Sequence, residues 1–469
     1  MITVYLDPNC DEPIYMQIYT HIKRSIERGE LKAHERLPSK RKFAKHLEVS
    51  VMTVETSYQQ LILEGYVYAR EKKGYFVEDY HSLKAHSARK AFDEGKRRTK
   101  DERTYRFSFD TNVVDTTKFP HHTWAKLARL VLSENHHEML NVTHPQGLLD
   151  LRVEIRKYLA QYRGIHVSEK QVVIGSGTES LIGAIIQMIG RNRRYGVEDP
   201  GYGKIRSIYA ASGVELRLMS LDDKGVRVDD SRQQAIDVMH ITPSHQFPLG
   251  IVMPVRRRIE LLNWASQEEN RYIIEDDYDS EFRFQGKPIP ALMGLDRNEK
   301  TIYMNTFTKS LAPSFRISYL VLPEHLMEAY DQISSYLGCS VPNFEQYILY
   351  EFMAGGYFER HINRMRNAYK AKRDALIARL NRAGRSDLIR IKGADAGLHF
   401  LLEIHNGMSE AELVARAKER GIRVSGLGSY YGRSKNDHSA LVIGYSGLRE
   451  KEIEVAVDEL IEAWELERP

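Results

Sequence analysis

Hydrophobic and polar positions follow two different patterns along this chain. The change from one pattern to the other divides the chain into an N-terminal and a C-terminal part. In the first 80 residues, apolar side chains recur at helical spacing in three stretches, and two short strand-like runs follow around a tight turn. The expected elements are helices over about residues 12–28, 39–47 and 50–65, then the strands YVYAR and YFVED. This order of three helices and a hairpin predicts a winged helix-turn-helix.

Beyond Tyr105 the pattern changes to short apolar strands that alternate with amphipathic helices. The strands are expected in VVIGSG, YGVEDPGY, AIDVMHITPS, RYIIEDDYD and TIYMNTFTKS. Such alternation predicts an α/β domain with a mostly parallel sheet wrapped by helices. A long helix near 359–383, followed by strands in GLHFLLEI and ALVIGY, predicts a smaller α+β lobe over roughly residues 340–469.

Charge and composition refine this division into domains. Residues 80–104 lack apolar periodicity and carry eight Lys and Arg against four Asp and Glu, which is typical of a charged linker. We therefore expect domains at 1–79 and 105–469. Two cysteines are too few for a disulfide framework, and no apolar run approaches the roughly 18 residues that span a membrane. We expect a cytoplasmic protein without a secretion signal or a membrane partner.

The N-terminal helices contain basic side chains where DNA contacts are made. In a helix-turn-helix the second helix enters the major groove, and a hairpin turn with glycine can approach the DNA backbone closely. Residues 1–79 are electrically balanced, with twelve basic and twelve acidic side chains, so the local clusters matter more than the net charge. The candidate DNA-binding residues are Lys40, Arg41, Lys45, Thr53, Lys72, Lys73 and Gly74.

The segment from LPSKRKFAKHLEVS to EKKGYFV resembles the GntR family of winged-helix regulators. The resemblance implies binding to a double-stranded DNA operator, with Arg41, Thr53 and Gly74 at positions that the family uses against DNA. One departure is that Val51 and Met52 replace the polar or basic residues common at the start of the recognition helix. The alternative is a winged helix that makes only protein contacts.

A second group of residues suggests a site for pyridoxal 5′-phosphate (PLP), which needs an amine, a carboxylate and a phosphate cradle. Lys309 follows an apolar strand, with the hydroxyl of Thr306 nearby, and Arg316 offers a charge-assisted contact to phosphate. Gly177 and Thr178 stand between a strand and a helix, where backbone N–H groups bind anions. The other candidates follow strand ends and are Asp276, Tyr278 and Tyr202.

In this order the pieces resemble fold-type I aminotransferases from about Phe107 to the C-terminus. The resemblance implies PLP as cofactor, with Lys309 as the Schiff-base lysine, Asp276 at the pyridine nitrogen and Tyr278 at the ring hydroxyl. It further implies phosphate contacts from Arg316, Gly177, Thr178 and Thr306. Together with TPSHQFP and IIEDDYDSEF, the whole chain resembles the MocR subfamily of GntR regulators and, within it, the GabR-like group.

Two departures from aminotransferases favour sensing over catalysis. Phe247 stands where those enzymes commonly have an asparagine, and Gly447 stands where a small-domain arginine usually binds the substrate carboxylate. An effector carboxylate would then need another partner, and the candidates are Lys204, Arg206 and Arg423. None of the histidines has metal-ligand spacing, so we expect no metal.

The sequence therefore predicts a PLP-dependent transcriptional regulator rather than an enzyme. It would recognise a small amine by forming an external aldimine at Lys309, and the subfamily's range includes D-alanyl-D-alanine, γ-aminobutyrate (GABA) and PLP itself. A homodimer is implied by the resemblance. Two alternatives stay open at this point, namely a catalytically active aminotransferase and a regulator that senses PLP itself.

Overall fold

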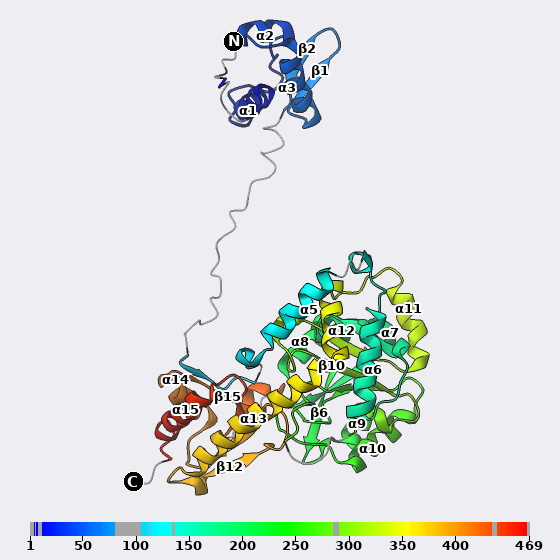
Figure 1. Ribbon diagram of the computed structural model, residues 1–469, viewed down its shortest axis with the longest axis vertical. Coiled ribbons are helices and arrows are strands. Elements are labelled where there is room, and N and C mark those ends of the chain that lie inside the picture. The colour runs from blue at the N-terminus through cyan, green and yellow to red at the C-terminus, as the bar shows by residue number, and fades with distance from the viewer. Residues whose placement is uncertain are drawn as a thin grey trace. The chain divides into compact units, whose positions relative to one another are not determined.

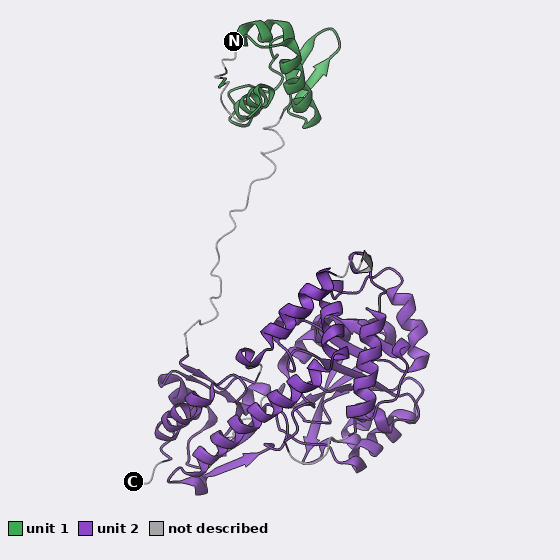
Figure 2. Cartoon of the chain, viewed as in Figure 1, with its two compact units in different colours: residues 1–102 green, residues 103–469 purple. Residues whose placement is uncertain are grey.

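In the computed structural model the chain forms two compact units, residues 1–102 and 103–469, which Figure 2 distinguishes by colour. The structure describes residues 4, 6–7, 12–79, 105–111, 113–133, 137–284, 290–433 and 439–466. The charged segment 80–104 lies outside these residues, so its role as a linker stays a prediction.

The first unit consists of three helices and a hairpin, which confirms the predicted winged helix-turn-helix (Figure 1). Its elements are α1 (Ile14–Glu27), α2 (Lys40–Leu47), α3 (Val51–Leu63), β1 (Val67–Arg70) and β2 (Gly74–Val77). Ser39 and Ser50 cap α2 and α3, because their side-chain oxygens accept hydrogen bonds from backbone N–H groups at 3.3 and 3.0 Å. Pro13 precedes α1, which begins two residues later than the predicted helix.

A compact apolar core fixes the recognition helix α3 in this unit. Ile18 and Ile22 of α1 pack with Val54, Tyr58 and Leu61 of α3, and all five are fully buried. Burial of each such side chain stabilises the fold by roughly 1.5–3 kcal/mol. The Tyr58 hydroxyl donates to the carbonyl of Pro38 at 2.9 Å and so ties α3 to the start of α2. The N-terminus of α3 is therefore held in a defined position.

An eight-stranded sheet forms the centre of the second unit. In spatial order its strands are β4 (Val172–Gly175), β11 (Ser318–Val321), β10 (Thr301–Thr306), β9 (Tyr272–Asp276), β8 (Val238–Ile241), β5 (Arg194–Asp199), β6 (Glu215–Asp222) and β7 (Gly225–Val226). The strands from β10 to β6 pair in parallel, while β11 and β7 pair with their neighbours antiparallel. The predicted mostly parallel sheet is confirmed.

Helices cover both faces of this sheet (Figure 1). Val172 and Ile174 of β4 contact the core formed with α5 (His121–Ser133), α6 (Leu149–Arg163) and α12 (Asn343–Ala354). Val173 points to the opposite core, formed with α7 (Thr178–Ile189), α8 (Gly203–Ala211) and α11 (Met327–Ser334). Two further helices, α9 (Val228–Gln233) and α10 (Val255–Ser266), pack together near β6 and β9. Alternate side chains of one strand thus enter separate cores, as a buried strand requires.

A smaller antiparallel sheet lies in the C-terminal part of this unit. Its order is β12 (Ile389–Lys392), β13 (His399–Ile404), β16 (Ala440–Gly444) and β15 (Ser425–Gly426), and its core includes residues of α14 (Glu410–Glu419) and α15 (Glu450–Ala463). The short strand β14 (Ile422–Arg423) pairs in parallel with β3 (Phe107–Ser108). The beginning of the unit therefore joins its C-terminal core.

One helix, α13 (Tyr357–Asn381), belongs to both cores of the second unit. Phe358 and Ile362 pack in the core of the large sheet, whereas Met365 and Tyr369 pack in the C-terminal core. The predicted small lobe began near residue 340, but Val341 also packs against the large sheet. Among the described residues, no helix is both long and apolar enough to cross a membrane.

Candidate functional site

The residues predicted to bind the cofactor line one cavity of about 150 Å³ in the second unit. They come from the ends of β4, β5, β9 and β10 and from the segments that follow these strands, because parallel strands end at the same edge of a sheet. The lining includes Lys309, Asp276, Tyr278, Tyr202, Gly177, Thr178, Thr306 and Arg316, together with Lys204 and Arg206. The individual roles of these residues in binding stay predictions.

Lys309 lies three residues beyond the end of β10 and is buried. Its Nζ donates a hydrogen bond to the backbone carbonyl of Thr111 at 2.7 Å. Burial lowers the pKa of Lys309 to about 8, against an opposing contribution from the Asp279 carboxylate. A substantial fraction of this amine is therefore neutral and nucleophilic near physiological pH.

Asp276 is the last residue of β9 and is supported by a buried histidine that sequence reasoning missed. His240 of the neighbouring strand β8 places its Nε2 3.4 Å from Oδ2 of Asp276. The other ring nitrogen lies 3.0 Å from the hydroxyl of Tyr209 on α8. This chain of contacts holds the Asp276 carboxylate in one orientation at the cavity wall.

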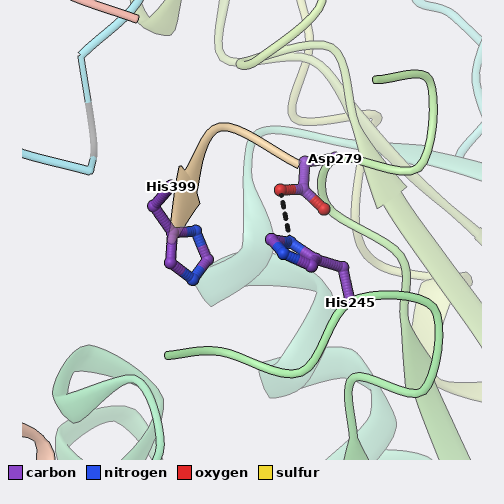
Figure 3. Close-up of side chains that lie close together, drawn as sticks. All are labelled: His245, Asp279 and His399. Carbon is purple, nitrogen blue, oxygen red and sulfur yellow. Dashed lines mark hydrogen bonds and ion pairs between the residues drawn. The ribbon is translucent and has the colours of Figure 1, made fainter. Parts of the chain in front are cut away.

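The Tyr278 hydroxyl is positioned by a second buried group. It donates to the backbone carbonyl of His245 at 3.0 Å, and Nδ1 of His245 lies 3.0 Å from Oδ2 of Asp279. Figure 3 shows this pair beside His399, whose ring centroid is 4.7 Å from that of His245. Burial and the nearby His245 hold the pKa of His399 well below its usual range, so this imidazole is neutral.

The histidines lack metal-ligand spacing along the chain, yet donor atoms of His245, Asp279 and His399 lie within 4.8 Å of one another. Two of their ring nitrogens already face acceptors, because Nε2 of His399 lies 3.2 Å from the carbonyl of Pro248 and Nδ1 of His245 faces Asp279. We therefore interpret His245, held by Asp279, as hydrogen-bonding support for Tyr278. The expectation of no metal stays a prediction.

Four lining residues, Gly177, Thr178, Thr306 and Arg316, form a candidate anion-binding cradle. Gly177 is the N-cap of α7. Gly177 has φ +97°, and a Cβ at this position would overlap the guanidinium of Arg316, so only glycine leaves room. The Thr306 hydroxyl donates to the Thr308 hydroxyl at 2.7 Å. Backbone N–H groups at the start of a helix, hydroxyls and a guanidinium are the donors that a phosphate dianion needs. The residues present therefore fit PLP.

The cradle also contains a carboxylate that was not among the residues expected from the sequence. Glu179 is the second residue of α7 and lines the same cavity. Its side chain forms an ion pair with Arg316 and lies 3.5 Å from Nζ of Lys204.

The three candidates for an effector carboxylate have different environments. Lys204 and Arg206 line the cavity, and Nη1 of Arg206 donates to the backbone carbonyl of Tyr430 at 2.7 Å. Arg423 is not among the lining residues; its guanidinium is half exposed and pairs with Asp110 at 3.2 Å.

The two positions that depart from aminotransferases also differ in whether they line the cavity. Phe247 lines the cavity and packs edge-to-face against Tyr202 and Tyr430, with ring centroids 5.5 and 5.2 Å apart. Gly447 is not among the lining residues, and a side chain there would collide with Val113.

The candidate DNA-binding residues lie on α2, at the start of α3 and in the hairpin turn. Arg41 and Lys45 are exposed on α2, and Lys72 and Lys73 are exposed in the turn before Gly74. Lys40 differs from them, because its Nζ pairs with the Glu55 carboxylate at 2.6 Å within the unit.

The start of α3 combines a polar cap with apolar side chains. The hydroxyls of Thr53 and Ser50 lie 2.8 Å apart, so Thr53 takes part in capping the helix. Val51 and Met52 are exposed at this helix end, where a recognition helix contacts base edges.

Each of the two units matches the model of a known protein family. The model of bacterial regulatory proteins of the gntR family matches residues 14–77, and that of class I and II aminotransferases matches residues 107–460. A solved multiple substrate aminotransferase from Thermococcus profundus is 24% identical with a TM-score of 0.69, over 78% of this chain and 92% of that one, which shows the shared fold.

Several relatives match nearly the whole length of this chain. The uncharacterized HTH-type transcriptional regulator YdeL of Bacillus subtilis is 36% identical, over 99% of this chain and 100% of that protein. The probable rhizopine catabolism regulatory protein MocR of Rhizobium meliloti is 30% identical, over 98% of this chain and 95% of that protein. The chain therefore belongs to the MocR subfamily of GntR transcriptional regulators, in which a DNA-binding winged helix-turn-helix is joined to a class I and II aminotransferase domain.

Proposed function

We propose that this regulator senses a small amine-bearing effector through PLP held in the cavity of its second unit, and transmits binding to an operator in double-stranded DNA. The observation that supports this most strongly is the buried amine of Lys309, which lines the same cavity as the anion cradle and Asp276. Because its pKa is lowered to about 8, the amine is available to bond an aldehyde.

When bound, PLP supplies an aldehyde carbon that can change amine partners and a ring that absorbs visible light. Lys309 would hold the cofactor covalently until an effector amine takes its place. Asp276, oriented by His240, would keep a proton on the ring nitrogen. The remaining contacts would come from Tyr278 and Tyr202 at the ring and from Gly177, Thr178, Thr306 and Arg316 at the phosphate.

The charges at the cavity support an effector that carries a carboxylate as well as an amine. With Gly447 in place of an arginine, an effector carboxylate must use another cation. Lys204 and Arg206 line the cavity, whereas Arg423 does not and is paired with Asp110. We therefore assign the carboxylate contact to Lys204 or Arg206, and the effector to amino acids, short dipeptides such as D-alanyl-D-alanine, or GABA-like amines.

Regulation requires that the effector bind one conformation better than another, because equal affinity shifts no equilibrium. We propose a cytoplasmic homodimer whose two winged helices contact a paired operator, so that half-site spacing mirrors the symmetry of the protein. Residues 80–104 would set the reach between the winged helix and the sensing unit.

The test is a visible absorption spectrum of the full-length protein with PLP, before and after a panel of amines, beside Lys309→Ala. We expect a band in the wild type that one amine shifts, and no such band in the variant. A wild type that gains no band at any cofactor concentration would refute PLP-based sensing. Fluorescence anisotropy with a labelled operator duplex then measures whether the same amine changes DNA affinity.

A working aminotransferase is the second candidate, because the amine of Lys309 and the carboxylate of Asp276 line one cavity. Repeated turnover of an amino donor and a keto acid, abolished by Lys309→Ala, would establish it. A regulator that senses PLP itself is the third candidate. It requires weak and reversible cofactor binding. Glu179 is relevant to this requirement, because its carboxylate pairs with Arg316 in the cradle.

A further inference from the structure

Glu179 places a negative charge inside a cradle that is otherwise built for an anion. It lies at the second position of the 12-residue helix α7, next to Gly177 and Thr178. Its side chain lines the same cavity as Lys309 and is 39% exposed, so it faces the space that a phosphate would approach. A cradle formed only to bind phosphate has no need of a carboxylate at this point.

The carboxylate of Glu179 is shared between two cations. One oxygen forms the ion pair with Arg316, and the other lies 3.5 Å from Nζ of Lys204. Burial alone would raise the pKa of Glu179, but a backbone hydrogen bond, Lys204 and Arg316 outweigh it and hold the pKa below its usual range. Glu179 is therefore ionised at neutral pH.

Arg316 is constrained in the number of partners it can serve. Its backbone is left-handed, with φ +55°, and its guanidinium fills the space beside Gly177. Nη2 donates to the carbonyl of Ser176 at 3.2 Å and also contacts Glu179. A phosphate dianion that approaches this guanidinium meets the Glu179 carboxylate as a like charge and as a rival acceptor.

We propose that Glu179 is an internal competitor for the cofactor phosphate: it occupies Arg316 when phosphate is absent and must release Arg316 when phosphate binds. The consequence is weak, exchangeable cofactor binding, as expected of a protein whose ligand occupancy carries information. This inference rests on the proposed function, since it assumes that PLP binds in this cavity. It assigns a regulatory role to a side chain that the phosphate contacts themselves do not require.

The experiment compares two cofactor forms that differ only in the phosphate. Full-length wild type, Glu179→Gln and Glu154→Gln are titrated with PLP and with pyridoxal, and binding is followed by visible absorption. Glu154 is a matched control, because its carboxylate is on α6 of the same unit and pairs with Lys157. We expect Glu179→Gln to lower the dissociation constant for PLP at least tenfold and to leave that for pyridoxal unchanged. Glu154→Gln should alter neither.

A second comparison tests whether the effect passes through Arg316. In an Arg316→Gln background, Glu179→Gln should change PLP affinity less than in the wild type, because the contested cation is gone. An unchanged or weaker PLP affinity in Glu179→Gln would overturn the proposal, and so would an equal change for pyridoxal. A wild type that binds neither cofactor form would instead refute the proposed function, and the proposal with it.

Discussion

The lowered pKa of Lys309 leads to a quantitative prediction about how the cofactor attaches. Covalent attachment needs the neutral amine, and the perturbation is a change of pH from 6.5 to 10 on protein freed of cofactor. With a pKa of about 8, about one tenth of Lys309 is neutral at pH 7 and about half at pH 8. A lysine with the ordinary value near 10.5 would be only about 0.03% neutral at pH 7.

The second-order rate constant for attachment should therefore rise about fivefold between pH 7 and pH 8 and level off above about pH 9. Stopped-flow absorption with pyridoxal, which lacks the ionising phosphate, measures this rate constant. The same reaction with Nα-acetyl-lysine is the control, because its ordinary pKa predicts a rise of about tenfold per pH unit up to pH 9 and of about eightfold from pH 9 to pH 10. Dividing the protein rates by the control rates removes any titration of the aldehyde.

A protein rate that parallels the rate for Nα-acetyl-lysine up to pH 10 would refute the reasoning, since burial would then have no effect on the pKa of Lys309. The variant Asp279→Asn tests the direction in which Asp279 shifts the pKa of Lys309. The Asp279 carboxylate opposes the effect of burial, so its removal should move the midpoint of the rate profile below pH 8. An upward movement would contradict the assigned cause. Circular dichroism checks that the variant is folded, because Asp279 also pairs with His245.

Three further predictions concern other parts of the molecule. Gly177→Ala should lower the free energy of unfolding by about 1–2 kcal/mol in urea titrations, because alanine at positive φ is strained and meets Arg316; wild-type stability would contradict this. His240→Ala should weaken PLP binding about tenfold, since Asp276 loses a buried partner; unchanged affinity would show that Asp276 needs no support. Lys73→Ala should reduce the salt slope of DNA binding by about one, whereas Lys224→Ala should not.

The sequence was sufficient for those parts of the site that follow strand ends. Lys309, Asp276 and Gly177 lie at strand-to-loop transitions that the apolar pattern marks, and a parallel sheet brings such transitions to one edge. The caps Ser39 and Ser50 were predictable for a similar reason, because capping depends on residues three positions apart. The short strand β11 was not singled out, since a run of only four residues, SYLV, directly after a loop fits several structures.

The supporting contacts of the site were not predictable, because they depend on register and side-chain direction. His240 reaches Asp276 only because β8 lies beside β9, and nothing in the segment VMHITPS indicates that neighbour. The pairing of His245 with Asp279 and the sharing of Glu179 between two cations join residues 25 to 137 positions apart. Arg423 was expected near the effector but instead pairs with Asp110. Asp110 lies at the start of the unit, next to the strand β3 that pairs with β14 of the C-terminal lobe.

The helix α13 determines where the second unit can bend. Its first turns are fixed in the core of the large sheet through Phe358 and Ile362, and its later turns in the C-terminal core through Met365 and Tyr369. Neither sheet can rotate as a rigid body without either carrying this helix out of one core or flexing it between Ile362 and Met365. If the C-terminal lobe moves while both cores stay packed, we expect α13 to flex over less than one helical turn, and substitutions in that turn should alter the amplitude of movement without touching any ligand.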